Sequence, residues 1–496
     1  MTVLLFVILA FPLLLLFLHR KHRKNGGLLP PGPPGLPFIG NLHQMHNSAP
    51  HRYLWQLSKQ YGPLMSLRLG FVPTIVVSSA KIAREVMKTH DLEFASRPSL
   101  IGQQRLSYNC RDLAFSPYND YWREMRKICV LHLFTMKRVK SYTPIREYEV
   151  SQMIEKISKL ASASKLINLS EALMFLTSTI ICRVAFGKRY EDGGCERSRF
   201  HGLLNDAQAL LGSFFFSDYF PLMGWLDKLT GLTAQLEKTF REMDLFYQEI
   251  IEEHLKPDRK KQEQDDITDV LIGLQKDNDF GIDITWDHIK GVLMNIFLGG
   301  TDTGTATVIW AMTALMKNPR VMKKAQEEVR YTFGKKGFIG EDDVEKLPYL
   351  KAVVKEAMRL LPAAPLLVPR ETLQKCSIDG YEIPPKTLVF VNAWAIGRDP
   401  EAWENPEEFI PERFLGSSVD FRGQHYQLIP FGAGRRVCPG LQIGVVTVEL
   451  TLANLLHSFD WEMPAGMNKE DIDLDTLPGI TMHKRNALCL VAKNYN

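Results

Sequence analysis

The residues with the clearest capacity for chemistry lie near the C-terminus, in segment 430–440, Pro-Phe-Gly-Ala-Gly-Arg-Arg-Val-Cys-Pro-Gly. The apolar stretch 441–458 that follows predicts a helix, so the thiol of Cys438 would lie just before a helix N-terminus. Free backbone N–H groups there lower the pKa of a thiol and favour the metal-binding thiolate. The glycines allow a flat cofactor to approach closely, and Arg436 can reach a carboxylate on its edge. The alternative is a buried structural cysteine in a glycine-rich turn.

A second group of chemically useful residues lies within a predicted helix. The range 285–318 begins with a helix start signal, ends before a proline and is largely apolar. Its middle, 299–304, reads Gly-Gly-Thr-Asp-Thr-Gly. Two adjacent glycines cost a helix about 2 kcal/mol relative to alanine and leave room beside the backbone. Asp302 and Thr303 can relay protons to a group bound in that room. A helix kink without a catalytic role is the alternative.

These two segments resemble the haem-binding loop and the oxygen-binding helix of the cytochrome P-450 monooxygenases. The loop pattern Phe-x-x-Gly-x-Arg-x-Cys-x-Gly is filled by Phe431, Gly434, Arg436, Cys438 and Gly440. The resemblance implies that Cys438 is the axial thiolate ligand of haem b iron, the ligand type that favours O–O cleavage. It also implies proton delivery by Asp302 and Thr303. Gly304 departs from the family, which usually has Ser or Thr there, so a second hydroxyl is missing.

The resemblance extends to residues that would hold the haem carboxylates. Trp122 and Arg126 share one face of a predicted helix, and in the family this pair meets a haem propionate. The arginine matching Arg370 does the same. With Arg436, three cations would then neutralise two carboxylates, which suits the bidentate chemistry of arginine. Taken alone, Trp122 and Arg126 also fit an ordinary amphipathic helix.

A structural ion network is implied in the same way. Glu356 and Arg359 lie at i and i+3 on one face of a largely apolar predicted helix. They resemble the Glu-x-x-Arg helix of the family, whose pair is locked by a later arginine. Arg413 in Pro-Glu-Arg-Phe would be that third partner.

The elements that must position these residues are mostly helices. Helical periodicity dominates from 81 to about 275, and alternation at 61–79 and 387–391 predicts short strands. The predicted fold class is therefore mainly α with a minor β-sheet. The resemblance implies the cytochrome P-450 fold, as a single large haem domain behind an N-terminal membrane anchor.

Composition sets the broad class. The chain has 496 residues, 45% of them hydrophobic and 23% charged, which is enough to build a large core. The net charge of +4 is spread along the chain, so no nucleic acid partner is expected. The seven cysteines are scattered without a Cys-x-x-Cys pair, which argues against a disulfide framework and a structural zinc site.

The N-terminus predicts a transmembrane anchor over residues 1–18. Apart from Pro12 this run is apolar and gives roughly 27 Å of helix, near the minimum that spans the thin endoplasmic reticulum bilayer. The basic run 19–24 follows it and no lysine or arginine precedes it, so the positive-inside rule places the domain in the cytosol. The predicted protein is a single-pass protein of that membrane. A cleaved signal peptide is the alternative, but its charges and cleavage site are missing.

Three regions follow from this division. They are the anchor, 1–18; a basic patch and proline-rich hinge, 19–50; and a haem-thiolate monooxygenase domain, 51–496. The prolines of 29–37 predict a stiff, extended spacer. The apolar stretch 213–225 predicts either plain core or a channel mouth that dips into the bilayer.

The resemblance implies a monooxygenase that inserts one oxygen atom from O₂ into a small lipophilic plant specialised metabolite of the terpenoid, phenolic or aldoxime class. The tail 477–484 resembles the plant subgroup that includes aldoxime-oxidising enzymes. The chain shows no flavin or nicotinamide motif, so a separate NADPH-dependent reductase is the expected partner. The expected pocket linings are mostly apolar, with Arg105, Arg111 and Asp112 as fixed charges: 105–115, 293–300, 363–368 and 478–482.

Two other functions remain open from the sequence. One is a haem-thiolate isomerase or dehydratase of hydroperoxides, which needs neither O₂ nor a reductase. The intact pair Asp302 and Thr303 and the uninterrupted cysteine loop argue against it. The other is a non-enzymatic haem protein, a ligand sensor or carrier, which would not need a proton relay.

Overall fold

The computed structural model of the chain describes residues 29–45, 49–190, 195–259, 264–277 and 280–495. The predicted anchor, 1–18, and the basic run 19–24 lie outside the described residues. Two described helices, α8 (Leu169–Phe186) and α19 (Leu441–Ser458), are long and apolar enough to cross a membrane. Most of each is buried inside the protein, so both serve as core helices.

Helices make up most of the described chain, as the sequence predicts. The others are α2 (Pro50–Tyr61), α3 (Ala80–Arg84), α4 (Ile101–Leu106), α5 (Asp120–His132), α6 (Met136–Ser141), α7 (Thr143–Ser162), α9 (Cys195–Leu211), α10 (Phe216–Tyr219), α11 (Trp225–Leu229), α12 (Leu232–Leu255), α13 (Ile267–Asp277), α14 (Trp286–Lys317), α15 (Pro319–Phe333), α16 (Glu341–Val344), α17 (Pro348–Leu360) and α18 (Ala393–Ile396). Short 3₁₀ or π turns occur at Leu42–Gln44, Glu85–Thr89, Pro221–Met223, Pro411–Phe414, Gly434–Arg436 and Lys469–Asp471.

The strands form small sheets. The main sheet has the order β1-β2-β7-β4, in which β2 and β7 are parallel and the other pairs antiparallel. A second sheet has the order β3-β9-β8, and β5 pairs with β6. The strands are β1 (Leu64–Leu69), β2 (Val72–Val77), β3 (Ile167–Asn168), β4 (Arg370–Glu371), β5 (Cys376–Ile378), β6 (Tyr381–Ile383), β7 (Leu388–Val391), β8 (Phe459–Glu462) and β9 (Cys489–Asn494).

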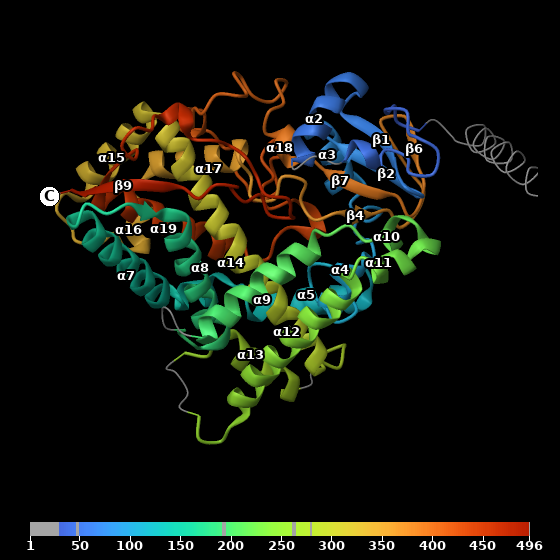
Figure 1. The fold of residues 1–496 in the computed structure, drawn as a ribbon, viewed down its shortest axis with the longest axis horizontal. Helices are drawn as coiled ribbons and strands as arrows, with labels where there is room; N and C mark the ends of the chain where they lie inside the picture. Colours follow the sequence, from blue (N-terminus) through green and yellow to red (C-terminus); the bar gives the residue numbers. More distant parts are fainter. Residues whose placement is uncertain (1–28, 46–48, 191–194, 260–263, 278–279, 496) are drawn as a thin grey trace, which may run out of the picture.

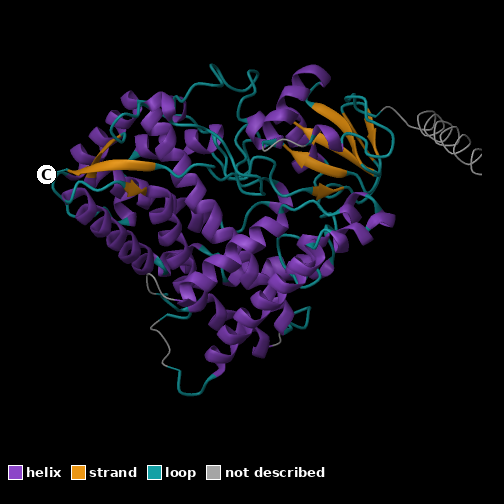
Figure 2. Cartoon of the chain, in the orientation of Figure 1, coloured by secondary structure: helices purple, strands orange, loops and turns teal. Residues whose placement is uncertain are grey.

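The main sheet and the helices occupy different parts of the molecule. In Figure 1 the sheet lies at the upper right with α2, α3 and the short helix α18, while most of the other helices fill the left and lower parts. Figure 2 shows most strands in that one corner and β9 on the opposite side. The helix α14 runs through the middle and packs on α8, α17 and α19. The predicted mainly α architecture with a minor sheet is confirmed.

The central helix α14 has the ends that the sequence predicts. Thr285 is its N-cap and forms a capping box with His288, and Asn318 is its C-cap. The helix continues through its glycine pair without a break. A Cβ at Gly300 would lie 2.5 Å from Cδ1 of Ile181 in α8, so glycine lets the two helices approach closely. Burial along almost the whole helix offsets the propensity cost of the glycines.

The proline-rich segment is not a free spacer over its whole length. The carbonyl of Pro30 accepts a hydrogen bond from the Ser66 hydroxyl in β1, at 2.6 Å. The carbonyl of Pro31 accepts one from the Ser66 amide, at 2.9 Å. The segment at Pro30 and Pro31 therefore packs against β1.

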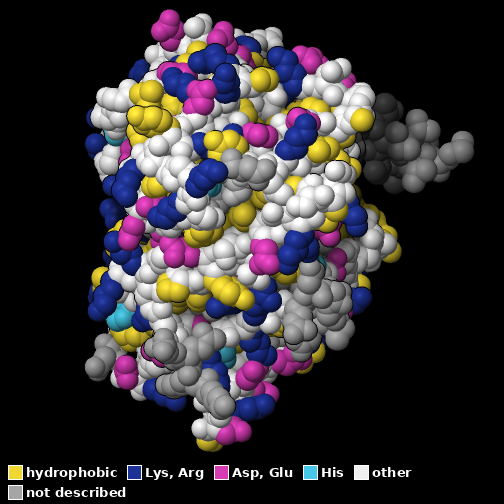
Figure 3. Space-filling view, turned by 90° about the vertical axis from the view of Figure 1, so that its left-hand side faces the viewer, with side chains coloured by type: hydrophobic (Ala, Val, Ile, Leu, Met, Phe, Trp, Pro, Cys, Tyr) yellow, Lys and Arg dark blue, Asp and Glu magenta, His cyan; other side chains and the backbone are white. Residues whose placement is uncertain are grey.

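The apolar stretch 213–225 divides into buried and exposed side chains. Phe215 and Phe220 are buried, whereas Leu222 is 93% exposed and Trp225 is 57% exposed. The stretch is therefore core in part and an apolar surface in part. On the face shown in Figure 3, by contrast, basic and acidic side chains are interspersed with scattered hydrophobic ones.

Candidate active site

The cysteine loop is closed on itself just before α19. The amide of Cys438 donates to the carbonyl of Phe431 at 3.0 Å, and the turn Gly434–Arg436 leads into it. The Phe431 ring is half-buried against Phe421, with ring centroids 5.7 Å apart. Helix α19 begins at Leu441, as predicted.

The thiol of Cys438 lies within the body of the protein, but its side chain faces an open space. Its side chain is exposed, while burial raises the pKa of the thiol above its usual value. The amide of Gly440 and the charge of Arg126 act in the opposite direction on this pKa. The prediction of a lowered thiol pKa is therefore wrong for the protein alone, because burial outweighs the helix N-terminus. A cationic metal bound to the sulfur would reverse this balance.

Two of the loop glycines are needed for different reasons. Gly434 has φ +69°, and a Cβ there would collide with the carbonyl oxygen of Met87 and with the Asp91 carboxylate. The same carboxylate accepts from the amide of Arg435, which fixes the loop on the turn Glu85–Thr89. Gly440 has room, since a Cβ there would be 3.9 Å from Sγ of Cys438. No atom of the described residues therefore requires glycine at 440, which fits close approach by a bound group.

The predicted cations converge next to this loop. The guanidinium of Arg436 lies 3.9 Å from the ring centroid of Trp122, and that of Arg126 lies 5.7 Å from it. Arg126 donates to the carbonyl of Val437 at 2.6 Å, and Arg370 donates to that of Ala433 at 2.9 Å. The structure thus brings together Trp122, Arg126, Arg370 and Arg436. The indole N–H of Trp122 donates to a backbone carbonyl, that of Leu113, at 3.0 Å.

A fourth cation, Arg97, was not predicted. Its guanidinium is 7% exposed and donates to the carbonyls of Ala114 and Pro369 at 2.9 and 2.7 Å. The charges of Arg436, Arg370 and Arg126 all act on it. No spacing in the sequence signals this arginine, because its partners are distant in the chain.

Three buried guanidiniums and the half-buried one of Arg126 form a positive cluster, which tests whether a haem fits here. Burial first, and the charge of Arg370 second, lower the pKa of Arg436 to about 9. Burial also lowers the pKa of Arg370 to about 10, although Asp91 at 3.7 Å opposes the shift. In the described part of the chain Arg97 and Arg436 donate only to backbone carbonyls. Buried cations of this kind need anionic partners. The two carboxylates of a haem fit the cluster, and the open thiol beside it fits the iron.

The other predicted site residues lie in the middle of α14. Gly299 is exposed within this largely buried helix, and no heavy atom of the described residues would lie within 4 Å of a Cβ there. Its carbonyl accepts a hydrogen bond of 2.7 Å from the hydroxyl of Thr303. Asp302, by contrast, is 3% exposed and lies 2.7 Å from the imidazole of His483. Of the predicted pair, Thr303 is therefore half-buried and Asp302 is buried. The contact of Asp302 with His483 was not predicted.

The structural ion network is present as predicted. Nε of Arg359 lies 2.6 Å from Oε2 of Glu356, and Nε of Arg413 lies 3.1 Å from its Oε1. The side chains of Glu356 and Arg359 are fully buried. Arg359 also donates to the carbonyls of Pro406 and Glu408, at 2.7 and 2.9 Å. The network ties α17 to the segment that leads to the cysteine loop.

The fixed charges in the expected pocket linings all have partners. Arg105 makes a bidentate pair with Glu237 of α12, at 2.7 and 2.8 Å. Arg111 pairs with Asp287 of α14 at 2.6 Å. Burial raises the pKa of Asp112 to about 6, and its Oδ2 accepts from the Asn295 amide at 2.8 Å. None of these three charges is therefore left unpaired.

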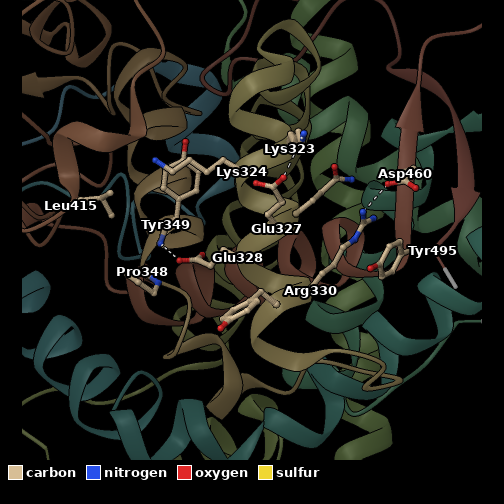
Figure 4. A pocket seen from close by; sticks show the side chains of 12 residues that line it. Lys323, Lys324, Glu327, Glu328, Arg330, Pro348, Tyr349, Leu415, Asp460 and Tyr495 are labelled. Atoms are coloured by element: carbon tan, nitrogen blue, oxygen red, sulfur yellow. Dashed lines mark hydrogen bonds and ion pairs between the residues drawn. The ribbon is translucent and has the colours of Figure 1, made fainter.

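The structure also has an open groove elsewhere, of about 1030 Å³, lined by α15, α17 and β8. Figure 4 shows its polar wall, where Glu328 accepts from the Tyr349 amide and Arg330 contacts Asp460. None of the predicted site residues lines this groove. It is a separate surface feature.

Comparisons with known proteins agree with this geometry. The family model described as Cytochrome P450 matches residues 30–491. The chain is 53% identical to a 6,7,8-trihydroxycoumarin synthase from Pastinaca sativa, over 99% of both chains. It is 51% identical to cytochrome P450 71A1 from Persea americana, over 99% of this chain and 98% of that one. A zebra fish cytochrome P450 structure with progesterone has a TM-score of 0.77 at 27% identity, covering 90% of this chain and 100% of that one.

These similarities extend over nearly the whole chain, and they meet a site whose thiol and buried cations fit a haem. Haem held by a cysteine thiolate supports monooxygenase chemistry with O₂, a lipophilic substrate and electrons from a redox partner. The chain therefore belongs to the cytochrome P450 family, with its fold, and is a haem-thiolate monooxygenase of plant specialised metabolism.

Proposed function

We propose that this chain hydroxylates the aromatic ring of a coumarin or a related phenolic compound. The observation that carries the substrate class is the 53% identity to an enzyme named for making a trihydroxycoumarin. A 5-OH-xanthotoxin synthase from Pastinaca sativa is 51% identical. The pairing of Arg105, Arg111 and Asp112 with other residues supports a neutral, flat substrate. These names favour the phenolic class over the terpenoid and aldoxime classes.

The residues that would hold haem b follow from the cysteine loop and the cation cluster. Cys438 would supply the thiolate that holds the iron, and Phe431, Gly434 and Gly440 shape the loop around it. Arg126, Arg370 and Arg436 would bind the two propionates, and Arg97 would add a fourth cation. The ring of Trp122 lies 3.9 Å from the Arg436 guanidinium and supports it. When bound, the haem supplies the activation of O₂.

The residues of α14 would supply protons. Asp302 and Thr303 are adjacent in sequence, next to the open position Gly299. The Thr303 hydroxyl donates a hydrogen bond to the carbonyl of Gly299, so its oxygen can still accept a hydrogen bond from another donor. Asp302 carries a carboxyl that can take up and release protons. Together they move protons from the helix to the site where oxygen is reduced.

The protein would work at the cytosolic surface of the endoplasmic reticulum membrane. The apolar run 1–18 is its single anchor, followed by the basic run 19–24. The exposed side chains Leu222, Trp225 and Leu229 form an apolar surface that can enter the bilayer. Electrons come from a separate NADPH-dependent reductase, because this chain shows no motif for flavin or nicotinamide.

The test is expression in microsomes with a plant reductase and NADPH. The panel contains hydroxycoumarins, furanocoumarins, terpenes and aldoximes, and mass spectrometry measures oxygenated products. We expect NADPH-dependent hydroxylation of coumarins and no product from Cys438→Ala. Turnover of only terpenes or aldoximes would overturn the substrate class. Turnover of an added lipid hydroperoxide without NADPH would favour the isomerase or dehydratase.

A further inference from the structure

A buried acid of α14 and a histidine near the C-terminus form a close pair that the sequence does not predict. Nε2 of His483 lies 2.7 Å from Oδ1 of Asp302. The Asp302 side chain is 4% exposed, whereas that of His483 is 26% exposed. The contact therefore joins a buried carboxyl to a partly exposed imidazole.

The backbone around His483 is built to hold this position. The indole N–H of Trp310, on α14, donates to the carbonyl of Met482 at 2.7 Å. The amide of Met482 donates to the carbonyl of Ala363 at 2.7 Å, and the carbonyl of His483 accepts from Leu477 at 2.9 Å. The residue before His483 is thus fixed to the same helix that carries Asp302. The pair rests on a defined backbone rather than on a free loop.

The neighbouring cations have other partners. Lys484 lies 2.8 Å from the Asp473 carboxylate, and Arg485 donates to the carbonyl of Thr476 at 3.1 Å. Oδ2 of Asp302 is buried and has no hydrogen-bond partner among the residues that the structure describes. One oxygen of the carboxyl therefore contacts His483, and the other remains available to a water or a bound group.

We propose that His483 is a positioning residue for proton delivery, which holds Asp302 and returns a proton to its carboxyl after each transfer. This inference rests on the proposed role of Asp302. Histidine is the side chain whose charge changes near neutral pH. The Nε2 proton passes to Oδ1 of Asp302, Asp302 passes a proton on toward the site, and the imidazole recovers one from solvent water. No electrons move in these steps, and the protons end in the water released by the monooxygenase reaction.

The competing explanation is a structural clamp that only fastens the C-terminal segment to α14. The variant His483→Gln distinguishes proton delivery from a structural clamp. Glutamine can still donate a hydrogen bond to Asp302 but cannot exchange a proton at neutral pH. His483→Ala removes both functions. The matched control is His457→Gln on α19, whose Nε2 contacts the carbonyl of Gly334 rather than an acid.

The first measurement is the fraction of NADPH electrons lost to hydrogen peroxide, in H₂O and in D₂O. We expect His483→Gln to raise this fraction several-fold and to increase the solvent isotope effect on product formation. His457→Gln should match the unmodified protein. Product formation driven by added hydrogen peroxide should be unchanged in His483→Gln, because that oxidant brings its own protons.

The second measurement does not depend on turnover. A double-mutant cycle with His483→Ala and Asp302→Asn, read from thermal unfolding midpoints, should show that the two changes are coupled. Additive midpoints would show that the pair does not exist in solution and would overturn the proposal. Normal electron use in His483→Gln, with losses only in His483→Ala, would leave a clamp and would also overturn it. If Asp302→Asn itself couples electrons normally, the proposed function of Asp302 fails instead.

Discussion

The hydroxyl of Thr303 donates a 2.7 Å hydrogen bond to the carbonyl of Gly299, one turn earlier in α14. The bond holds the hydroxyl of the half-buried Thr303 beside Gly299, which is exposed in the middle of a largely buried helix. The hydroxyl is therefore held by the helix itself and does not depend on substrate.

The first prediction concerns this hydroxyl. Thr303→Ala should keep the haem but divert most NADPH electrons to hydrogen peroxide, because no hydroxyl remains to pass protons. Thr303→Ser should recover most of the product yield per NADPH. Thr307→Ala is the matched control, since its hydroxyl donates to the carbonyl of Thr303 at 2.8 Å on the same helix. An unchanged yield in Thr303→Ala would remove Thr303 from the relay.

A second prediction concerns the missing second hydroxyl. A Cβ at Gly304 would lie 3.6 Å from Cγ2 of Thr177, an ordinary contact, so Gly304→Ser fits the structure. Replacing glycine within a helix should raise the free energy of unfolding by about 0.5 kcal/mol. We expect the thermal midpoint to rise slightly with no loss of haem. A lower midpoint would show that α8 packs more tightly here than the structure indicates.

The third prediction concerns the buried network of α17. Removing one partner leaves uncompensated charge, so Arg359→Ala should lower the free energy of unfolding by about 3–5 kcal/mol. The exposed pair Lys323 and Glu327, at 3.7 Å on α15, provides the control. Lys323→Ala should cost less than about 0.5 kcal/mol. Thermal unfolding of Arg359→Ala and Lys323→Ala shows whether a buried ion pair loses more stability than an exposed one.

Some of the site could be predicted from the sequence because its signals are local. The ends of α14 follow from Thr285 and Asn318, and the start of α19 follows from the apolar stretch 441–458. Arg97 and His483 could not be found in this way. Each meets its partners through the fold, across a long stretch of chain, and neither has a spacing pattern of its own. The sequence therefore predicts features that depend on neighbouring residues, but not contacts between residues that only the fold brings together.

The pKa of the Cys438 thiol likewise has one contribution that the sequence predicts and one that it does not. The helix N-terminus beside Cys438 was readable and acts on the thiol pKa in the predicted direction, through the amide of Gly440. The burial that outweighs it depends on how the loop lies against the rest of the protein. A sequence does not give that quantity. The direction of one contribution was therefore correct and the net result was not.

A fourth prediction separates the roles of the loop glycines. Gly434→Ala should prevent a correctly folded loop, because a Cβ collides with Met87 and the positive φ is strained. Gly440→Ala should leave the protein folded but lower the haem-to-protein ratio. Gly416→Ala is the control, with φ +70° and no described atom within 4 Å, so it carries only backbone strain of about 1 kcal/mol. Full haem content in Gly440→Ala would show that the cofactor does not approach this residue.

A fifth prediction uses pH. Burial raises the pKa of Glu449, on α19, from 4.5 to about 7. Between these values the folded protein binds more protons than the unfolded chain, so stability falls as pH rises from 4.5 to about 7 and stays lower above it. Glu449→Gln removes this effect. At pH 8 the free energy of unfolding of the variant should exceed that of the unmodified protein by about 1–3 kcal/mol, which raises its thermal midpoint. At pH 5 the two proteins should differ little.

The control for this pH effect is Glu327→Gln, because the Glu327 side chain is 63% exposed. It should leave the difference between pH 5 and pH 8 unchanged. An equal gain for Glu449→Gln at both pH values would mean that packing rather than charge is responsible. The absence of any gain at pH 8 would mean that Glu449 is paired in solution with Lys351 or Lys355, the cations whose charges lower its pKa. The pH dependence therefore separates burial from ion pairing at this position of α19.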